Sequence, residues 1–224
     1  MSSALPEFIL ASASPTRARV LREAGVRFRV VVSDVDEDAA VEAEAARRAE
    51  AGEASLTPAD TALILAQAKA RAVAPQVSGA VVLGCDSVFE LGGQVYGKPC
   101  TAEVARQRWA LMRGASGVLH TGHWLVDTRE DAGAPQAADG SGQAELGDTV
   151  STTVHFAAVT EAESDAYIAT GEPLLCAGAF TLDGRGAALV DGVEGDPHSV
   201  LGVSVQRTRA LLAELGLSLT DFSA

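Results

Sequence analysis

The stretch "LASASPTRARVLREAG", residues 10–25, joins an apolar segment to an amphipathic helix and decides how the fold begins. Ser14 is a favoured N-cap residue, Pro15 fits the first helical position, and Gly25 suits the position after the last turn. A helix is therefore predicted from Ser14. Its first turn leaves backbone N–H groups unpaired at the positive end of the helix dipole, and Arg17 lies in the same turn. The segment would attract an anion such as phosphate, unless it is an ordinary capped helix with a solvated arginine.

The segments on either side of this helix indicate alternating strands and helices. "EFILAS" before it and "FRVVVSDVDE" (28–37) after it are apolar enough for strands, which gives a β–α–β start. Residues 38–56 are rich in Ala and Glu without an apolar stripe, so we expect a surface helix or a mobile insertion there. A capped helix is predicted over 57–74, with Lys69 in its last turns.

A second apolar stretch, "GAVVLGCD" (79–86), predicts a buried central strand that ends at Asp86. The carboxyl ends of such strands are where α/β folds bind ligands. Beyond it we expect a hairpin around Gly92 and Gly93 and a flexible polar loop at 128–148 between two further strands. This order of elements predicts a mixed α/β fold, with a mixed, twisted sheet, flanking helices and two lobes around a cleft.

Composition limits the class of partner. The 224 residues, 47% of them hydrophobic, are enough for one sizeable core, so we expect a single domain over 1–224. A net charge of −13 would repel a nucleic-acid backbone or an anionic membrane. The apolar segments are shorter than a membrane span needs, and the N-terminus lacks the basic start and long apolar core typical of a signal peptide. We expect a cytoplasmic protein that binds no polynucleotide and no membrane. A small anionic ligand stays possible, because a few local cations and a divalent metal can hold it.

Three charged residues are candidates for such a site. Asp86 at a buried strand end is costly unless it binds a metal, pairs with a cation, faces a cleft or ties down a loop. Glu37, in "SDVDE", offers carboxylate oxygens for Mg²⁺ or Mn²⁺, although acidic runs at strand ends are more often simply solvated. Lys98, in "GGQVYGKP", is no Walker A lysine because Pro99 stands where that motif needs Ser or Thr, yet a stiff turn could aim it at phosphate.

Five separated motifs together resemble one family. "LASASPTR", "SDVDE", "AQAKA", "GCDSV" followed by "GKP", and "GEPLLCAGAFTLDGRGAALVDGVEGD" are similar in order and spacing to the Maf family of septum-formation-inhibitor-like nucleotide pyrophosphatases. The resemblance implies an α/β fold related to inosine-triphosphatase-like enzymes and hydrolysis of nucleoside triphosphates between the α- and β-phosphates. It also implies a possible homodimer. Matched by position, Asp86 corresponds to the proton acceptor, and the family's other polar site residues correspond to Ser14, Arg17, Glu37, Lys69 and Lys98.

We therefore expect Glu37 and Asp86 to help hold Mg²⁺ or Mn²⁺ on the phosphates while the cations neutralise charge. The chain departs from the family pattern at Thr16, Ser87 and Asp183, positions that the family links to base selectivity, so its substrate base is not assigned. Two other classes remain as alternatives. One is a nucleotide-binding regulator of cell division without significant turnover, and the other is an interaction protein that uses the 38–56 insertion.

Overall fold

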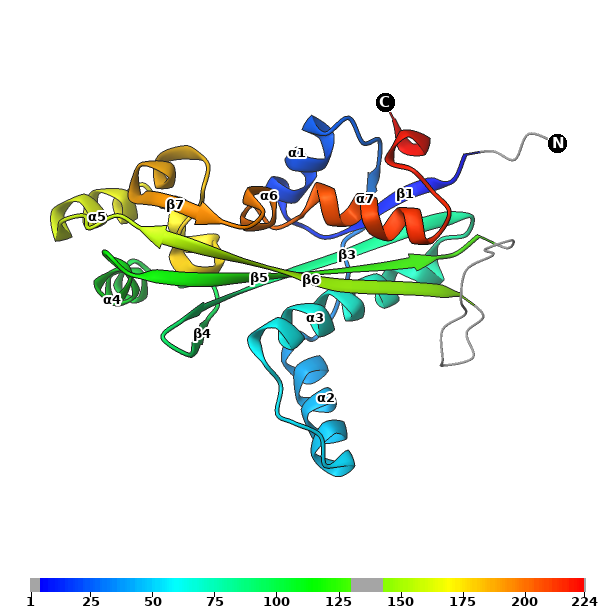
Figure 1. The fold of residues 1–224 in the computed structure, drawn as a ribbon, viewed down its shortest axis with the longest axis horizontal. Coiled ribbons are helices and arrows are strands. Elements are labelled where there is room, and N and C mark those ends of the chain that lie inside the picture. Colours follow the sequence, from blue (N-terminus) through cyan, green and yellow to red (C-terminus); the bar gives the residue numbers. More distant parts are fainter. Residues whose placement is uncertain (1–4, 130–142, 224) are drawn as a thin grey trace.

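The computed structural model describes residues 5–129 and 143–223, which form a long sheet with helices on both faces (Figure 1). The strands are β1 Glu7–Ala11, β2 Arg29–Val30, β3 Ala80–Leu91, β4 Gln94–Tyr96, β5 Ser116–Asp127, β6 Ala144–Phe156 and β7 Val190–Glu194. The helices are α1 Pro15–Glu23, α2 Glu37–Ala51, α3 Pro58–Val73, α4 Ala102–Met112, α5 Glu161–Ala169, α6 Pro197–Val200 and α7 Val205–Glu214.

The sheet is mixed, with strand order β2-β1-β3-β5-β6-β7 and the short β4 beside β3. β1 pairs parallel with both β2 and β3, as the β–α–β start predicts, and the remaining pairs are antiparallel. The predicted mixed α/β fold with flanking helices is confirmed. The long strands β3, β5 and β6 run through the whole molecule and give it its elongated shape (Figure 1).

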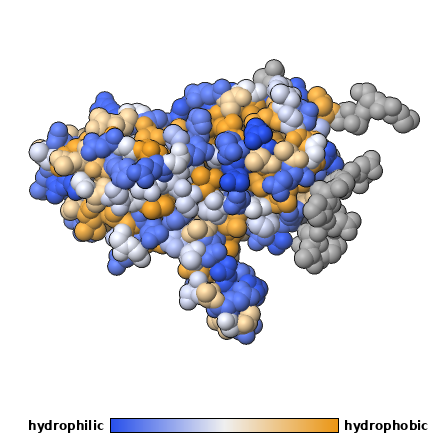
Figure 2. All heavy atoms as spheres, viewed as in Figure 1, coloured by the Kyte–Doolittle hydropathy of each residue, from blue (hydrophilic) through white to orange (hydrophobic). Residues whose placement is uncertain are grey.

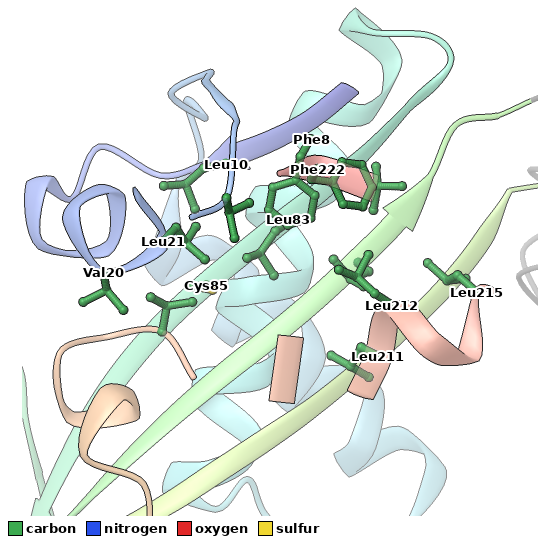
Figure 3. Close-up of a cluster of buried hydrophobic side chains, with 14 of the residues drawn as sticks. Phe8, Leu10, Val20, Leu21, Leu83, Cys85, Leu211, Leu212, Leu215 and Phe222 are labelled. Carbon is green, nitrogen blue, oxygen red and sulfur yellow. The ribbon is translucent and has the colours of Figure 1, made fainter. Parts of the chain in front are cut away.

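Two apolar clusters lie along one face of these long strands. Leu83 and Cys85 of β3 pack with Leu21 of α1 and with apolar residues of β1 and α7 (Figure 3). Further along β3, Phe89 packs with Trp109 of α4 and with aromatic residues beside α5. The two lobes expected from the sequence correspond to these clusters, and the stretch of β3 between them carries Asp86.

On the opposite face, α3 lies directly on the backbone of β3 and β5. A Cβ atom built on Gly84 would lie 2.1 Å from the carbonyl oxygen of Ala66, and one on Gly122 would lie 2.2 Å from that of Ala62. Neither distance leaves room for a side chain. Gly84 of β3 and Gly122 of β5, whose positions in the strand pairing are two residues apart, therefore allow α3 to approach the sheet without a layer of side chains at these points.

Three boundaries differ from the sequence predictions. The strand predicted to end at Asp86 continues to Leu91, because β5 pairs with β3 as far as Glu90. The strand predicted over 28–37 is only Arg29–Val30, since its single neighbour in the sheet is the short β1. The strand after the predicted 128–148 loop already begins at Ala144; residues 130–142 lie outside the described part.

The predicted insertion at 38–56 is largely the helix α2, which projects from the sheet beside α3 (Figure 1). Asp36 caps it through the backbone N–H of Ala39, and none of its residues is buried. Hydrophilic residues cover much of this projection (Figure 2). Arg48 joins it to α3 through an ion pair with Asp60 at 3.2 Å. Of the two sequence interpretations, the structure confirms the surface helix.

Within residues 5–129 and 143–223, none of the helices combines the length and the apolar character needed to cross a membrane. That residues 1–224 fold as one domain stays a prediction.

Candidate active site

One edge of β3 changes its partner strand part-way along. β1 pairs with Ala80 to Gly84, and β4 pairs with Phe89 to Leu91. In the described ranges no strand pairs with residues 85–88 on this edge, so the edge is open there. Asp86 and Ser87 lie in the open stretch and, as successive strand residues, point to opposite faces of the sheet.

On the face covered by α3, a lysine lies between two carboxylates. Lys69 Nζ is 2.5 Å from Asp86 Oδ1 and 2.7 Å from Glu37 Oε1. The side chains of Lys69 and Asp86 are only 12% and 13% exposed, whereas that of Glu37, at the start of α2, is 53% exposed. One ammonium group thus pairs with both acids and leaves the three side chains with one net negative charge. Both carboxylates therefore flank the same small volume at the open edge.

On the other face, the first turn of α1 holds an arginine against the same strand. Ser14 caps α1 by accepting from the backbone N–H of Arg17 at 3.3 Å. The Arg17 guanidinium donates to Ser12 Oγ at 3.0 Å, to Ser87 Oγ at 3.2 Å and to the carbonyl of Gly202 at 2.7 Å. These three bonds fix the guanidinium at the edge of β3, where the helix N-terminus adds its positive potential.

The hydroxyl groups behind Arg17 have a fixed donor order. Thr121 Oγ1 donates to the buried carbonyl of Ser199 at 2.8 Å and lies 3.0 Å from Ser87 Oγ. Because a hydroxyl carries a single hydrogen, Thr121 can only accept from Ser87. Ser87 therefore donates its single hydroxyl hydrogen to Thr121, and its oxygen accepts from Arg17. The chain of donors runs from Arg17 through Ser87 and Thr121 to Ser199.

Two titratable groups beside Arg17 are buried and uncharged. Burial, helped by the nearby Arg17, lowers the pKa of His123 to about 4. The neutral ring accepts the backbone N–H of Ser204, the cap of α7, at 2.7 Å. Burial raises the pKa of Cys85 to about 12, against the opposing charges of Arg17 and Lys69. Neither group therefore carries charge near neutral pH, and the Cys85 thiol is a poor nucleophile.

Lys98 follows β4 and lies on the same edge of β3. Continuing the register of Phe89 with Tyr96 brings residue 98 level with Ser87. The backbone just before Lys98 is fixed, because Arg108 Nη1 donates to the carbonyl of Gly97 at 2.5 Å. The Lys98 side chain is exposed and has no hydrogen bond or ion pair within the described ranges, so it is free to meet a ligand.

The three predicted specificity residues occupy different surroundings. Thr16 is half-buried in the first turn of α1, beside Arg17. Ser87 belongs to the donor chain described above. Asp183 pairs with Arg19 of α1 and accepts from Thr181, so both of its carboxylate oxygens already have partners. The structure therefore brings Ser14, Arg17 and Ser87 together on one face and Glu37, Lys69 and Asp86 on the other.

A family model described as Maf-like protein matches residues 7–215. The chain belongs to the Maf-like protein family. It is 48% identical over 216 residues to a protein of Saccharopolyspora erythraea named nucleoside triphosphate pyrophosphatase, with 94% of each chain covered. Proteins of the same name from Streptomyces coelicolor and Rhodococcus jostii are 46% identical over 218 residues and 45% over 225. These matches cover 96% and 98% of this chain and 94% and 97% of the relatives.

Several residues that shape the site of this Maf-like chain escaped the sequence analysis. Ser12 lies inside the opening motif and was detectable only as one more hydroxyl there. Thr121 and the carbonyls of Ser199 and Gly202 act through tertiary contacts, which no local sequence pattern predicts. Arg108 reads as an ordinary helical arginine, yet it is only 7% exposed and its guanidinium lies 5.1 Å from the ring centroid of Tyr96.

Proposed function

We propose that this chain hydrolyses nucleoside triphosphates to the monophosphate and pyrophosphate, the activity that the names of its relatives indicate for them. The observation that carries the proposal is the open edge of β3, with the Glu37–Lys69–Asp86 group on one side and Arg17 on the other. A polyphosphate at this edge meets cations from both faces. A carboxylate that can take a proton from water lies beside it.

In the proposed reaction Asp86 orients a water molecule and accepts its proton as the oxygen attacks the α-phosphorus. The bond from this phosphorus to the bridging oxygen breaks, and pyrophosphate leaves with the electron pair. Lys69 and Arg17 neutralise the charge that develops on the phosphate oxygens, and Lys98 reaches the same edge from the β4 side. Ser14 contributes by keeping the N-terminus of α1 formed, so that its N–H groups face the anion.

The donor set suits a divalent cation. Glu37 and Asp86 are hard oxygen donors that contact the same ammonium group, and Mg²⁺ is commonly bound by one or two carboxylates together with substrate phosphates. In the described part of the chain no three His, Cys, Asp or Glu side chains form a metal site, so phosphate oxygens would complete the shell. Bound there, Mg²⁺ or Mn²⁺ supplies positive charge to the reacting phosphates.

Base selectivity is the finer part of the proposal. Thr16 precedes Arg17 in α1, and Asp183 forms an ion pair with Arg19 of the same helix. Both residues can therefore change the substrate preference by way of α1. We now assign Ser87 to positioning Arg17 because its only hydrogen is directed at Thr121. An Asp183→Gln variant whose ranking of bases equals that of the wild type would remove Asp183 from the selectivity set.

The deciding experiment measures pyrophosphate release from a panel of nucleoside triphosphates with Mg²⁺ or Mn²⁺. Wild type is compared with Asp86→Asn and with a control, Asp191→Asn, at an exposed position of β7. Release that depends on metal, is lost in Asp86→Asn and persists in the control supports the proposal. Triphosphate binding without release from any substrate would favour the regulator without turnover, which the names of the relatives do not support.

Two further expectations stay predictions. A homodimer would be detected by light scattering of the purified chain. A cytoplasmic location would be detected by fractionation of cells that express it.

A further inference from the structure

Three polar side chains, Glu90, His120 and Ser151, form a row across β3, β5 and β6 beyond the N-terminal end of α3. His120 Nε2 lies 3.1 Å from Glu90 Oε2, and His120 Nδ1 lies 2.8 Å from Ser151 Oγ. His120 is only 8% exposed, whereas the Glu90 side chain is 30% exposed. A histidine is thus held from both sides, and the acid at the end of the row reaches solvent.

The carboxylate of Glu90 keeps one oxygen available. A carboxylate oxygen only accepts, so His120 Nε2 carries the hydrogen and donates it to Oε2. The other oxygen, Oε1, has no hydrogen bond in residues 5–129 and 143–223. Because His120 fixes the orientation of the carboxylate, this oxygen is a preorganised acceptor for an N–H or O–H group.

Glu90 lies on the same face of the sheet as Asp86. Gly84 and Asp86 both face α3, so the alternation of β3 turns Val88 and Glu90 to that side as well. Four residues of strand separate Asp86 from Glu90, about 13 Å between their Cα atoms at ~3.3 Å per residue. This span is comparable with the length of a nucleoside monophosphate, and the apolar Val88 lies between its ends.

We propose that Glu90, oriented by His120, accepts a hydrogen bond from the nucleoside part of the substrate, either a sugar hydroxyl or an N–H of the base. This assignment rests on the proposed function. A second carboxylate would repel phosphates, so it fits only the uncharged end of the substrate. With the phosphates at Lys69 and Arg17, the nucleoside extends along the edge of β3, past the buried Val88, to Glu90. His120 is a positioning residue in this arrangement.

A similar Ser–His–Glu group lies at the outer end of the sheet, but there the histidine does not hydrogen-bond the carboxylate. His155 Nδ1 lies 2.7 Å from Ser116 Oγ, and His155 Nε2 lies 3.2 Å from Glu194 Oε1. The Glu194 side chain is 77% exposed, at the far end of β7. The proposal therefore rests on where Glu90 lies relative to Asp86, and Glu194 provides a matched control.

The test compares Glu90→Gln with Glu194→Gln in steady-state hydrolysis of nucleoside triphosphates. We expect Glu90→Gln to raise KM about tenfold or more while kcat changes by less than about threefold, because a charged acceptor is lost far from the reacting bond. Inorganic tripolyphosphate, which has no nucleoside, should inhibit wild type and Glu90→Gln with the same Ki. Glu194→Gln should match wild type throughout.

Substrate analogues identify the bonded group. If loss of the 2′- or 3′-hydroxyl removes the difference between wild type and Glu90→Gln, the sugar is the donor; if only a change of base removes it, the base is. His120→Leu should also raise KM, and His120→Gln, which can still donate to Glu90, should recover most of the loss.

An unchanged KM in Glu90→Gln, or an equal rise in the Ki of tripolyphosphate, would overturn the assignment. If the wild type releases no pyrophosphate, calorimetric binding of a nucleoside triphosphate to wild type and Glu90→Gln still tests it: an equal Kd overturns it, and weaker binding to Glu90→Gln supports it. Failure of the proposed function and failure of the assignment therefore give different results.

Discussion

The guanidinium of Arg17 donates to the hydroxyl of Ser87 at 3.2 Å, and this bond joins the first turn of α1 to the strand that carries Asp86. The hydrogen of Ser87 goes on to Thr121, which donates to the carbonyl of Ser199. A substitution at Ser87 or Thr121 is therefore expected to alter how Arg17 is held, although Thr121 does not lie on the open edge of β3.

Thr121 gives the sharpest test of this chain of donors. Thr121→Val keeps the shape but removes one of the two donors to the buried Ser199 carbonyl, which still accepts from the backbone N–H of Gly202 at 2.9 Å, and it removes the acceptor of Ser87. We expect a loss of about 0.5–1.5 kcal/mol in the free energy of unfolding and up to about a tenfold loss in kcat/KM, because Ser87, one of the three groups that hold Arg17, loses its own acceptor. Denaturant unfolding and pyrophosphate release measure the two effects. Thr121→Ser keeps the hydroxyl and should stay close to wild type in kcat/KM; an equal loss in both variants would contradict the donor chain.

Gly84 controls the distance between α3 and the sheet. In Gly84→Ala the new methyl group would lie 2.1 Å from the carbonyl of Ala66, so α3 must move and Lys69 with it. We expect destabilisation of about 1–3 kcal/mol or more, with loss of pyrophosphate release. Thermal unfolding and activity are measured on the same samples.

The control for Gly84 is Gly192→Ala, where the new Cβ would lie 3.8 Å from the nearest atom outside the neighbouring residues. It should leave both stability and activity nearly unchanged. A stable and active Gly84→Ala would show that the close approach of α3 does not position Lys69.

Lys69 is the cation that holds Glu37 and Asp86 together. Lys69→Met leaves two carboxylates facing the same volume and removes positive charge from the phosphates. We expect kcat to fall by about 100-fold or more, as for removal of a charge-stabilising donor. Steady-state kinetics at saturating Mg²⁺ measure it, with Lys69→Arg alongside to separate loss of charge from change of shape. A full kcat in Lys69→Met would exclude this lysine from the reaction.

Because of His123, the free energy of unfolding should fall in mild acid. Its folded pKa of about 4 lies below the unfolded value of about 6.5, so the unfolded chain takes up the proton first. The stability it contributes is complete above pH ~6.5 and is lost as the pH falls towards 4. Between pH 7.5 and pH 5 we expect a loss of about 2 kcal/mol in the free energy of unfolding from this group.

Denaturant unfolding at both pH values tests the contribution of His123. His123→Gln should have lower stability at pH 7.5 but a smaller difference between the two pH values. His198→Gln, at an exposed position, should keep the wild-type difference. The idea fails if His123→Gln retains the full difference.

Local chemistry explains what could be predicted from sequence. The cap at Ser14, the stop at Gly25 and the helix that carries Lys69 depend on neighbours within one or two turns, and all three form as expected. The boundary at Asp86 was wrong because pairing with β5, more than thirty residues later, continues the strand. Apolar runs indicate burial, but only a partner strand determines where a ladder ends.

The sequence by itself determined the family, the order of elements and the identity of the charged residues, because motif spacing and helix signals are local properties of the chain. Only the tertiary structure decided that Arg17 and Lys69 approach β3 from opposite faces and that Lys69 lies between two acids. It also decided the donor chain through Thr121 and the position of Glu90. These relationships depend on strand register and on the close packing of α3 against Gly84 and Gly122, which join residues far apart in sequence.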